Sequence, residues 1–121
     1  MSYEFYKIIH IFSIALVLIS LGGLTLHVMN GGSKASNAKK KLVMITHGVG
    51  LLLLLVSGFG MHAKLGLSGI PLWLVGKLVI WLLFGGMVAI IYKKASFGIK
   101  IWCLIPVLVA VASWLAIYKP L

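Results

Sequence analysis

The sequence predicts an all-α integral membrane protein, a four-helix bundle whose helices run antiparallel in an up-down-up-down order. Hydrophobic residues make up 62% of the 121 residues, and the mean hydropathy is +1.17. Soluble domains contain about 45–50% apolar residues, so we do not expect a water-soluble fold. Four apolar stretches are separated by short polar segments. The whole chain, residues 1–121, is expected to form a single transmembrane domain.

The four apolar stretches are the predicted helices. A helix needs about 20 residues to cross the hydrocarbon core of a bilayer. In lipid each stretch must satisfy its own backbone hydrogen bonds, which favours a helix over an open sheet. The short connections force consecutive helices to run antiparallel. We expect the helices at residues 8–29, 42–61, 71–92 and 101–118.

The first two stretches are bounded by polar residues. The stretch 8–29 follows Lys7 and ends at the polar residues 30–32. It is too long for the apolar region of a signal peptide, so we expect it to be retained as a helix. The stretch 42–61 follows a run of lysines and is followed by His62.

The other two stretches are bounded by lysines and aromatic residues. The stretch 71–92 is followed by Lys93, and the stretch 101–118 is preceded by Lys100. Amphipathic aromatic rings anchor helices at the membrane–water interface. Such rings occur near the ends of the stretches, at Tyr3, Tyr6, Trp73, Tyr92, Trp102, Trp114 and Tyr118.

The distribution of charge predicts an orientation. Eleven lysines, no arginine and one acidic residue, Glu4, give a net charge of +10. The lysines lie mainly between the apolar stretches, as they do in membrane proteins, so we do not expect nucleic acid as a partner. The segments 30–41 and 93–100 carry four and three lysines. This asymmetry predicts both termini on the outer side of a bacterial inner (cytoplasmic) membrane.

The scarcity of other reactive side chains excludes several chemistries. The chain has no aspartate, and Glu4 lies near the N-terminus. Catalysis by paired carboxylates, a Ser-His-Asp triad and carboxylate-coupled proton transport therefore lack their residues. Cys103 is the only cysteine, so no intramolecular disulfide can form.

Histidines occur in pairs on the first two predicted helices and are absent from the other two. His10 and His62 should lie at the outer level of antiparallel helices, and His27 and His47 at the inner level. The histidines of each helix are 17 and 15 residues apart, which corresponds to about 25 Å and 22 Å. Two facing imidazoles are the axial ligands of a low-spin b-type haem. The sequence therefore predicts one or two haems, with His10 and His62, and His27 and His47, as iron ligands.

The angular positions of the histidines favour one haem over two. At about 100° per residue, the histidines of the first helix point about 100° apart and those of the second about 60° apart. Two interpretations other than haem stay open. Near helix ends an imidazole can contact water or lipid headgroups without any ligand. Copper or zinc could use the same imidazoles, with soft Cu(I) ligands from Met29, Met44 or Met61.

Lys77 is a charged residue inside the third apolar stretch, at the level of His10 and His62. A lysine at a helix centre costs about 2.5–3.5 kcal/mol on insertion scales, so its side chain should face the bundle or extend to the surface. A haem propionate would be a natural partner, because no intramembrane carboxylate competes for the ammonium. The alternative is a lysine that snorkels from near a helix end.

Several segments resemble the SirB family of small four-helix membrane proteins. The matching segments are Thr46-His47-Gly48 with the apolar residues 51–60, residues 71–78 (PLWLVGKL) and residues 85–89 (GGMVA). The segment YKIIHI around His10 resembles the start of both SirB and HemJ proteins. HemJ proteins also have a similar Trp-Leu-x-x-Lys segment. They bind haem and are implicated in oxidising protoporphyrinogen IX, so this resemblance implies a haem or porphyrin site at His10 and Lys77.

These observations together predict a membrane b-type haem protein that carries electrons within or across the membrane. A HemJ-like protoporphyrinogen oxidase and a non-catalytic, SirB-like accessory protein are the alternatives, so the sequence leaves open whether the chain is an enzyme. The chain departs from HemJ proteins in having no arginine and no His-rich segment after the lysine. The expected partners are the lipid bilayer, a redox partner such as a quinone, and a second copy in a homodimer.

Overall fold

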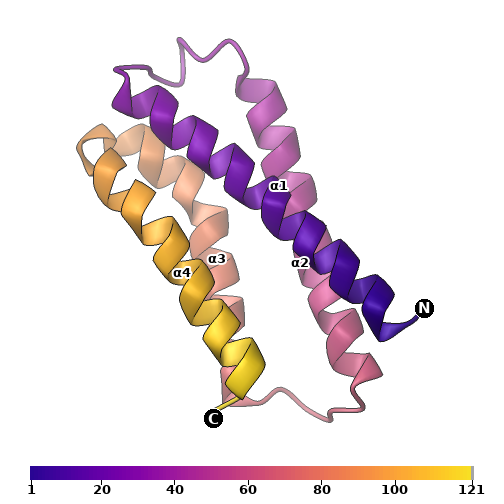
Figure 1. Ribbon diagram of the computed structural model, residues 1–121. Coiled ribbons are helices and arrows are strands. Elements are labelled where there is room, and N and C mark those ends of the chain that lie inside the picture. Colours follow the sequence, from indigo (N-terminus) through magenta and orange to yellow (C-terminus); the bar gives the residue numbers. More distant parts are fainter. Residues whose placement is uncertain (121) are drawn as a thin grey trace.

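The computed structural model describes residues 1–120, and these form helices and connecting segments without a β-strand. Four long helices stand side by side, each running opposite to the one before it (Figure 1). The predicted all-α four-helix bundle is therefore confirmed. The helices are α1 (Tyr3–Met29), α2 (Lys40–Lys64), α3 (Leu72–Lys93), the single 3₁₀ turn η1 (Ala95–Phe97) and α4 (Gly98–Tyr118).

Three helices begin before the apolar stretches that predict them. The helix α1 starts at Tyr3 because the Ser2 hydroxyl accepts a hydrogen bond from the Phe5 backbone N–H at 3.1 Å and caps the first turn. The apolar stretch marks only the part of a helix within the hydrocarbon, whereas the hydrogen-bonded helix continues into the interface. In contrast, α3 starts at Leu72, one residue later than predicted, because Pro71 has an extended backbone.

The bundle consists of two helical hairpins. The connections α1–α2 and α3–α4 lie at one end of the molecule, which we call the loop end (Figure 1). The α2–α3 connection and both chain ends lie at the opposite end, the termini end. The helix α1 packs along α2 over most of its length and also contacts α3 and α4, whereas α2 touches α3 at few positions.

Close packing of α1 and α2 depends on Gly50. A Cβ atom at this position would lie 3.0 Å from the Leu16 Cβ atom and 3.1 Å from the Val17 backbone nitrogen. Small residues allow the backbones of membrane helices to approach each other in this way. The adjacent core is formed mainly by α1, α3 and α4, with Leu21, Leu24 and Ile91 fully buried.

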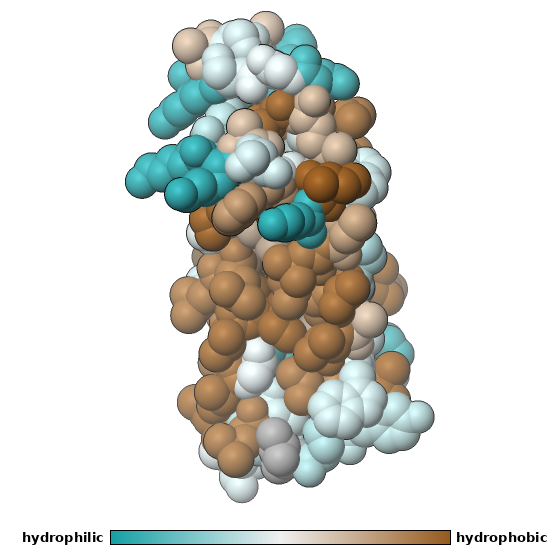
Figure 2. Space-filling view, turned by 90° about the vertical axis from the view of Figure 1, so that its left-hand side faces the viewer, coloured by the Kyte–Doolittle hydropathy of each residue, from teal (hydrophilic) through white to brown (hydrophobic). Residues whose placement is uncertain are grey.

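The outside of the bundle carries exposed apolar residues on all four long helices. Ile8, Ile19, Leu52, Leu82 and Ile117 are each more than 60% exposed. All four helices are long and apolar enough to cross a membrane. Figure 2 shows a band of hydrophobic residues along the length of the molecule and a cluster of hydrophilic residues at one end. Exposure of this apolar surface to water is unfavourable, whereas contact with lipid tails is not. The chain is therefore a multi-pass membrane protein.

Candidate ligand-binding cavity

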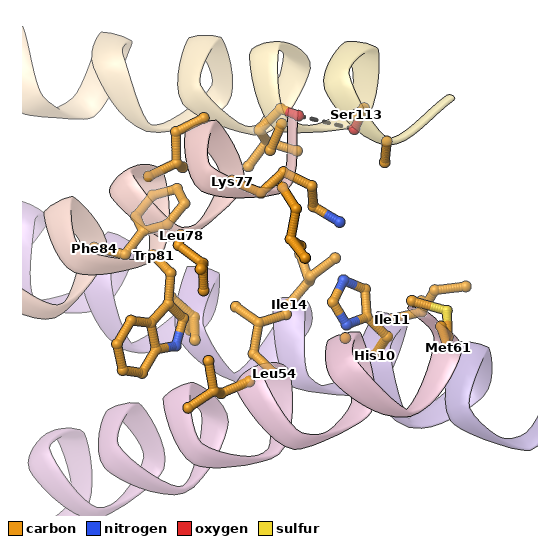
Figure 3. A pocket seen from close by; sticks show the side chains of 18 of the residues that line it. His10, Ile11, Ile14, Leu54, Met61, Lys77, Leu78, Trp81, Phe84 and Ser113 are labelled. Atoms are coloured by element: carbon orange, nitrogen blue, oxygen red, sulfur yellow. Dashed lines mark hydrogen bonds between the residues drawn. The ribbon is translucent and has the colours of Figure 1, made fainter. Parts of the chain in front are cut away.

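A cavity of about 290 Å³ lies inside the bundle, in the half nearer the termini end, and all four long helices contribute to its wall. Most of its lining is aliphatic or aromatic (Figure 3). Ligand pockets of this kind combine apolar walls with a few polar groups that orient the ligand. Here the polar groups come from Tyr3, Lys7, His10, Lys77 and Ser113.

The cavity lies next to the level at which two hydrogen bonds join α2 and α3. The indole Nε1–H of Trp81 donates to the Leu51 carbonyl at 2.9 Å, and His47 Nε2 donates to the Phe84 carbonyl at 3.0 Å. These are the hydrogen bonds between α2 and α3 within residues 1–120. Between this level and the contact of His62 with Trp73 near the termini end, side chains from both helices line the cavity.

His10 enters the cavity from α1 in a defined tautomer. Its Nδ1 atom lies 3.0 Å from the Ser57 hydroxyl, and that hydroxyl donates to the Leu54 carbonyl at 3.2 Å. A hydroxyl that gives its hydrogen to a carbonyl can only accept from the imidazole, so we assign the proton of His10 to Nδ1. Nε2 is then unprotonated with a free lone pair, and the His10 side chain lines the cavity.

Lys77 enters the same cavity from α3. Its side chain is partly buried, and Figure 3 shows the ammonium pointing toward the His10 ring. Glu4 is the only acidic side chain of the protein and does not line the cavity. The cavity therefore presents two lysines, Lys7 and Lys77, and an imidazole lone pair among apolar walls, an arrangement that suits a largely apolar ligand with an anionic group.

The other three histidines do not reach this cavity. Each is held through Nε2 by a backbone carbonyl: His27 by Ser33 at 3.0 Å, His47 by Phe84 at 3.0 Å and His62 by Gly69 at 2.9 Å. A backbone carbonyl only accepts, so these three Nε2 atoms carry protons. His10 is the one histidine whose Nε2 is left available to a ligand.

The predicted histidine pairs are therefore not brought together. His10 contacts Ser57 and not His62, because the two α2 residues are five positions apart and point about 140° away from each other around the helix. His62 bonds instead to Gly69 in the α2–α3 connection, and its ring packs edge-on against Trp73 in the first turn of α3. His27 and His47 also differ in direction, since one meets the α1–α2 connection and the other meets α3.

Metal ligands are similarly dispersed. Within residues 1–120, no group of three or more His, Cys, Asp or Glu side chains could hold a metal ion. Of the methionines considered as Cu(I) ligands, Met61 lines the cavity. Met44 is exposed, and Met29 is half exposed beside Gly98.

Ser57 is the site residue that sequence reasoning missed. Its hydroxyl is buried and sets the tautomer of His10. The available signal was a hydroxyl in an otherwise apolar stretch, at the level of His10 on the neighbouring antiparallel helix. Trp81, also in the cavity wall, was not singled out because it lies in the middle of its helix and not at the interface.

Comparisons with protein-family models, curated proteins and solved structures found no match to this chain.

Proposed function

We propose that this chain is a membrane haem protein that binds one b-type haem in the cavity, with His10 Nε2 as the axial ligand and Lys77 as the partner of a propionate. The observation that carries the proposal is the state of His10: Ser57 engages its Nδ1 and leaves Nε2 free, and the side chain lines a cavity that Lys77 also lines. A histidine that ligates a metal through one nitrogen characteristically donates its other N–H to a neighbouring acceptor.

The remaining chemistry of the cavity supports the same ligand. A haem is a flat apolar ring with carboxylate groups at one edge, which matches apolar walls that also carry the lysines Lys7 and Lys77. Bound haem iron would supply one-electron transfer, so the proposed role is electron carriage within the membrane, with a quinone as a suitable redox partner. Met61 is the second potential iron ligand in the cavity wall, as in sites with a His/Met pair.

The number of haems in this proposal is one, because the other three histidines use Nε2 for carbonyl groups. At about 290 Å³, the cavity is at the lower limit of ligand pockets, which span about 300–1,000 Å³. Binding a macrocycle therefore requires α2 and α3 to separate further on the side where no hydrogen bond joins them. Trp81 and His47 would hold the other half of the two helices together.

The proposed location is the inner membrane of a bacterium, with the loop end in the cytoplasm. The basis is the positive-inside rule: seven of the eleven lysines belong to the loop end. The cavity then lies nearer the outer surface, and it would receive or deliver electrons on that side.

The first test is the visible spectrum of the detergent-purified protein, expressed with ample haem, before and after reduction with dithionite. We expect a sharpened α-band on reduction and about one haem per chain by pyridine haemochromogen. His10→Ala should abolish or strongly reduce bound haem, and His27→Ala should not, because His27 lies outside the cavity. A colourless wild-type protein, or equal haem in both variants, would refute the proposal and favour an accessory role.

A HemJ-like protoporphyrinogen oxidase is a second candidate, favoured by the presence of His10 and Lys77 in one cavity. These are the residues on which the resemblance to HemJ proteins rests. Rescue of a bacterial strain lacking protoporphyrinogen oxidase distinguishes an oxidase from an electron carrier. Rescue by the wild type and not by Lys77→Gln would establish the oxidase, and failure despite normal expression would exclude it.

A further inference from the structure

The loop end carries an exposed cluster of lysines without acidic neighbours. Seven lysines belong to it, and all of them are exposed. Glu4, the only acidic side chain of the protein, lies at the termini end. Nothing in the side chains of the loop end can therefore neutralise this charge. The seven residues are Lys34, Lys39, Lys40, Lys41, Lys93, Lys94 and Lys100.

Two contacts join the two helical hairpins at the loop end. The Asn37 side-chain amide donates to the Tyr92 hydroxyl at 3.0 Å, so the α1–α2 connection lies against the end of α3. Met29, at the end of α1, packs against Gly98 at the start of α4. Lysines far apart in the sequence consequently share one surface, seen as the hydrophilic cluster at the upper end in Figure 2.

The α1–α2 connection also has internal order. The His27 imidazole donates to the Ser33 carbonyl, and the Ser36 hydroxyl accepts from the Ser33 backbone N–H at 2.8 Å. These bonds fold the connection into a compact turn before α2 begins at Lys40. A surface ordered in this way loses less conformational entropy when it binds a partner than a flexible basic tail would lose.

The position of the lysines identifies the partner. Most of them stand at helix ends close to the exposed apolar surface, for example Lys41 beside Leu42 and Lys93 one turn from Ile90. Lipid phosphates lie at this level, just above the hydrocarbon, and each lysine or arginine near an anionic leaflet adds to the attraction. We propose that the loop end binds the headgroups of anionic phospholipids in the adjacent leaflet.

Native mass spectrometry of the full-length protein tests this proposal. Equal concentrations of phosphatidylglycerol and phosphatidylcholine are added to the detergent-solubilised protein, and the bound fraction of each lipid is measured. We expect phosphatidylglycerol to be preferred about fivefold or more, and the preference to fall as salt rises, because it is electrostatic. The triple variant Lys39→Gln, Lys40→Gln and Lys41→Gln should lose most of it.

The control variant removes three exposed lysines from the other end, Lys7→Gln, Lys64→Gln and Lys119→Gln, and should keep the preference. A variant with arginine at residues 39–41 should also keep the preference for phosphatidylglycerol. Because this variant keeps the positive charge, it distinguishes an effect of charge from misfolding caused by substitution at these positions. Equal binding of the two lipids, or loss of the preference in the control variant only, would overturn the proposal. A second outcome would assign the loop end to nucleic acid instead. The wild-type protein would then show no lipid preference by mass spectrometry but would bind oligonucleotides when it is placed in phosphatidylcholine nanodiscs.

Discussion

His10 on α1 and Lys77 on α3 line one cavity, although the whole of α2 separates them in the sequence. Ser57 holds the imidazole through Nδ1, whereas no carboxylate among residues 1–120 lines the cavity beside the ammonium. A lysine at the centre of a membrane helix costs about 2.5–3.5 kcal/mol on insertion scales. An anionic ligand would offset that cost, which makes Lys77 the most direct probe of what the cavity binds.

We predict that Lys77→Gln lowers the affinity for haem about tenfold, because one charge-assisted contact contributes about 1.5–3 kcal/mol, part of which the amide retains. Titration of the apoprotein with haem, followed by absorbance, measures the change. Haem dimethyl ester carries no propionate charge and should bind equally well to the wild type and to Lys77→Gln. Lys64→Gln, a change of an exposed lysine at the same end, should leave both affinities unchanged.

Ser57→Ala should weaken haem binding about 10- to 100-fold, the usual effect of removing a group that orients a metal-ligating histidine. The reduced α-band should also shift, because the imidazole loses the acceptor of its Nδ1 proton. Ser113→Ala is the matched control, since Ser113 lines the cavity but bonds to the Val109 carbonyl of its own helix. Equal effects of the two changes would show that Ser57 has only a packing role.

Gly50→Ala should destabilise the protein by about 1–3 kcal/mol, the cost of overpacking a tight contact. The new methyl would meet the backbone of α1 at Val17, which cannot rotate away. Gly48→Ala on the same helix is the control, because a Cβ atom there meets nothing within 4 Å. Thermal unfolding in detergent, followed by circular dichroism, measures both. A lower midpoint for Gly48→Ala than for Gly50→Ala would contradict this account of the α1–α2 contact.

Cysteine labelling should place the loop end in the cytoplasm. In a Cys103→Ser background, Ser68→Cys in the α2–α3 connection should react with a membrane-impermeant maleimide in intact spheroplasts. Ala35→Cys in the α1–α2 connection should react only after lysis. Both positions are exposed, so access to the reagent decides the result. The opposite pattern would reverse the proposed orientation.

The four helices could be predicted because hydropathy and length are sufficient to identify a membrane span. The boundaries were less accurate: α1 begins at Tyr3, five residues before the apolar stretch, since Ser2 caps it outside the hydrocarbon. The levels of residues along the bundle also follow from the sequence once neighbouring helices are antiparallel. His10 and Lys77 were expected at one level, and both line the cavity.

The partners of the histidines could not be predicted. His62 was expected to face His10, but the turn at Gly69, whose backbone has a φ of +70°, presents a carbonyl to it. His47 was expected to face His27, but α3 supplies the carbonyl of Phe84 at its level. Both acceptors are backbone carbonyl oxygens, and the spacing of the histidines carries no information about where other segments place such atoms.

By itself the sequence determined that the chain crosses the membrane four times as helices, which of its residues lie at each level, and which end is rich in lysine. These properties depend on composition along the chain, because every span must satisfy its backbone in lipid. Only the tertiary structure decided which way each helix is turned about its axis. Helices that are apolar all round carry no stripe that marks the inward face. The close approach of Gly50 to α1 and the hydrogen bond from Trp81 to the Leu51 carbonyl set the rotation of α2 and α3 about their axes. In the resulting arrangement His10 and Lys77 line one cavity.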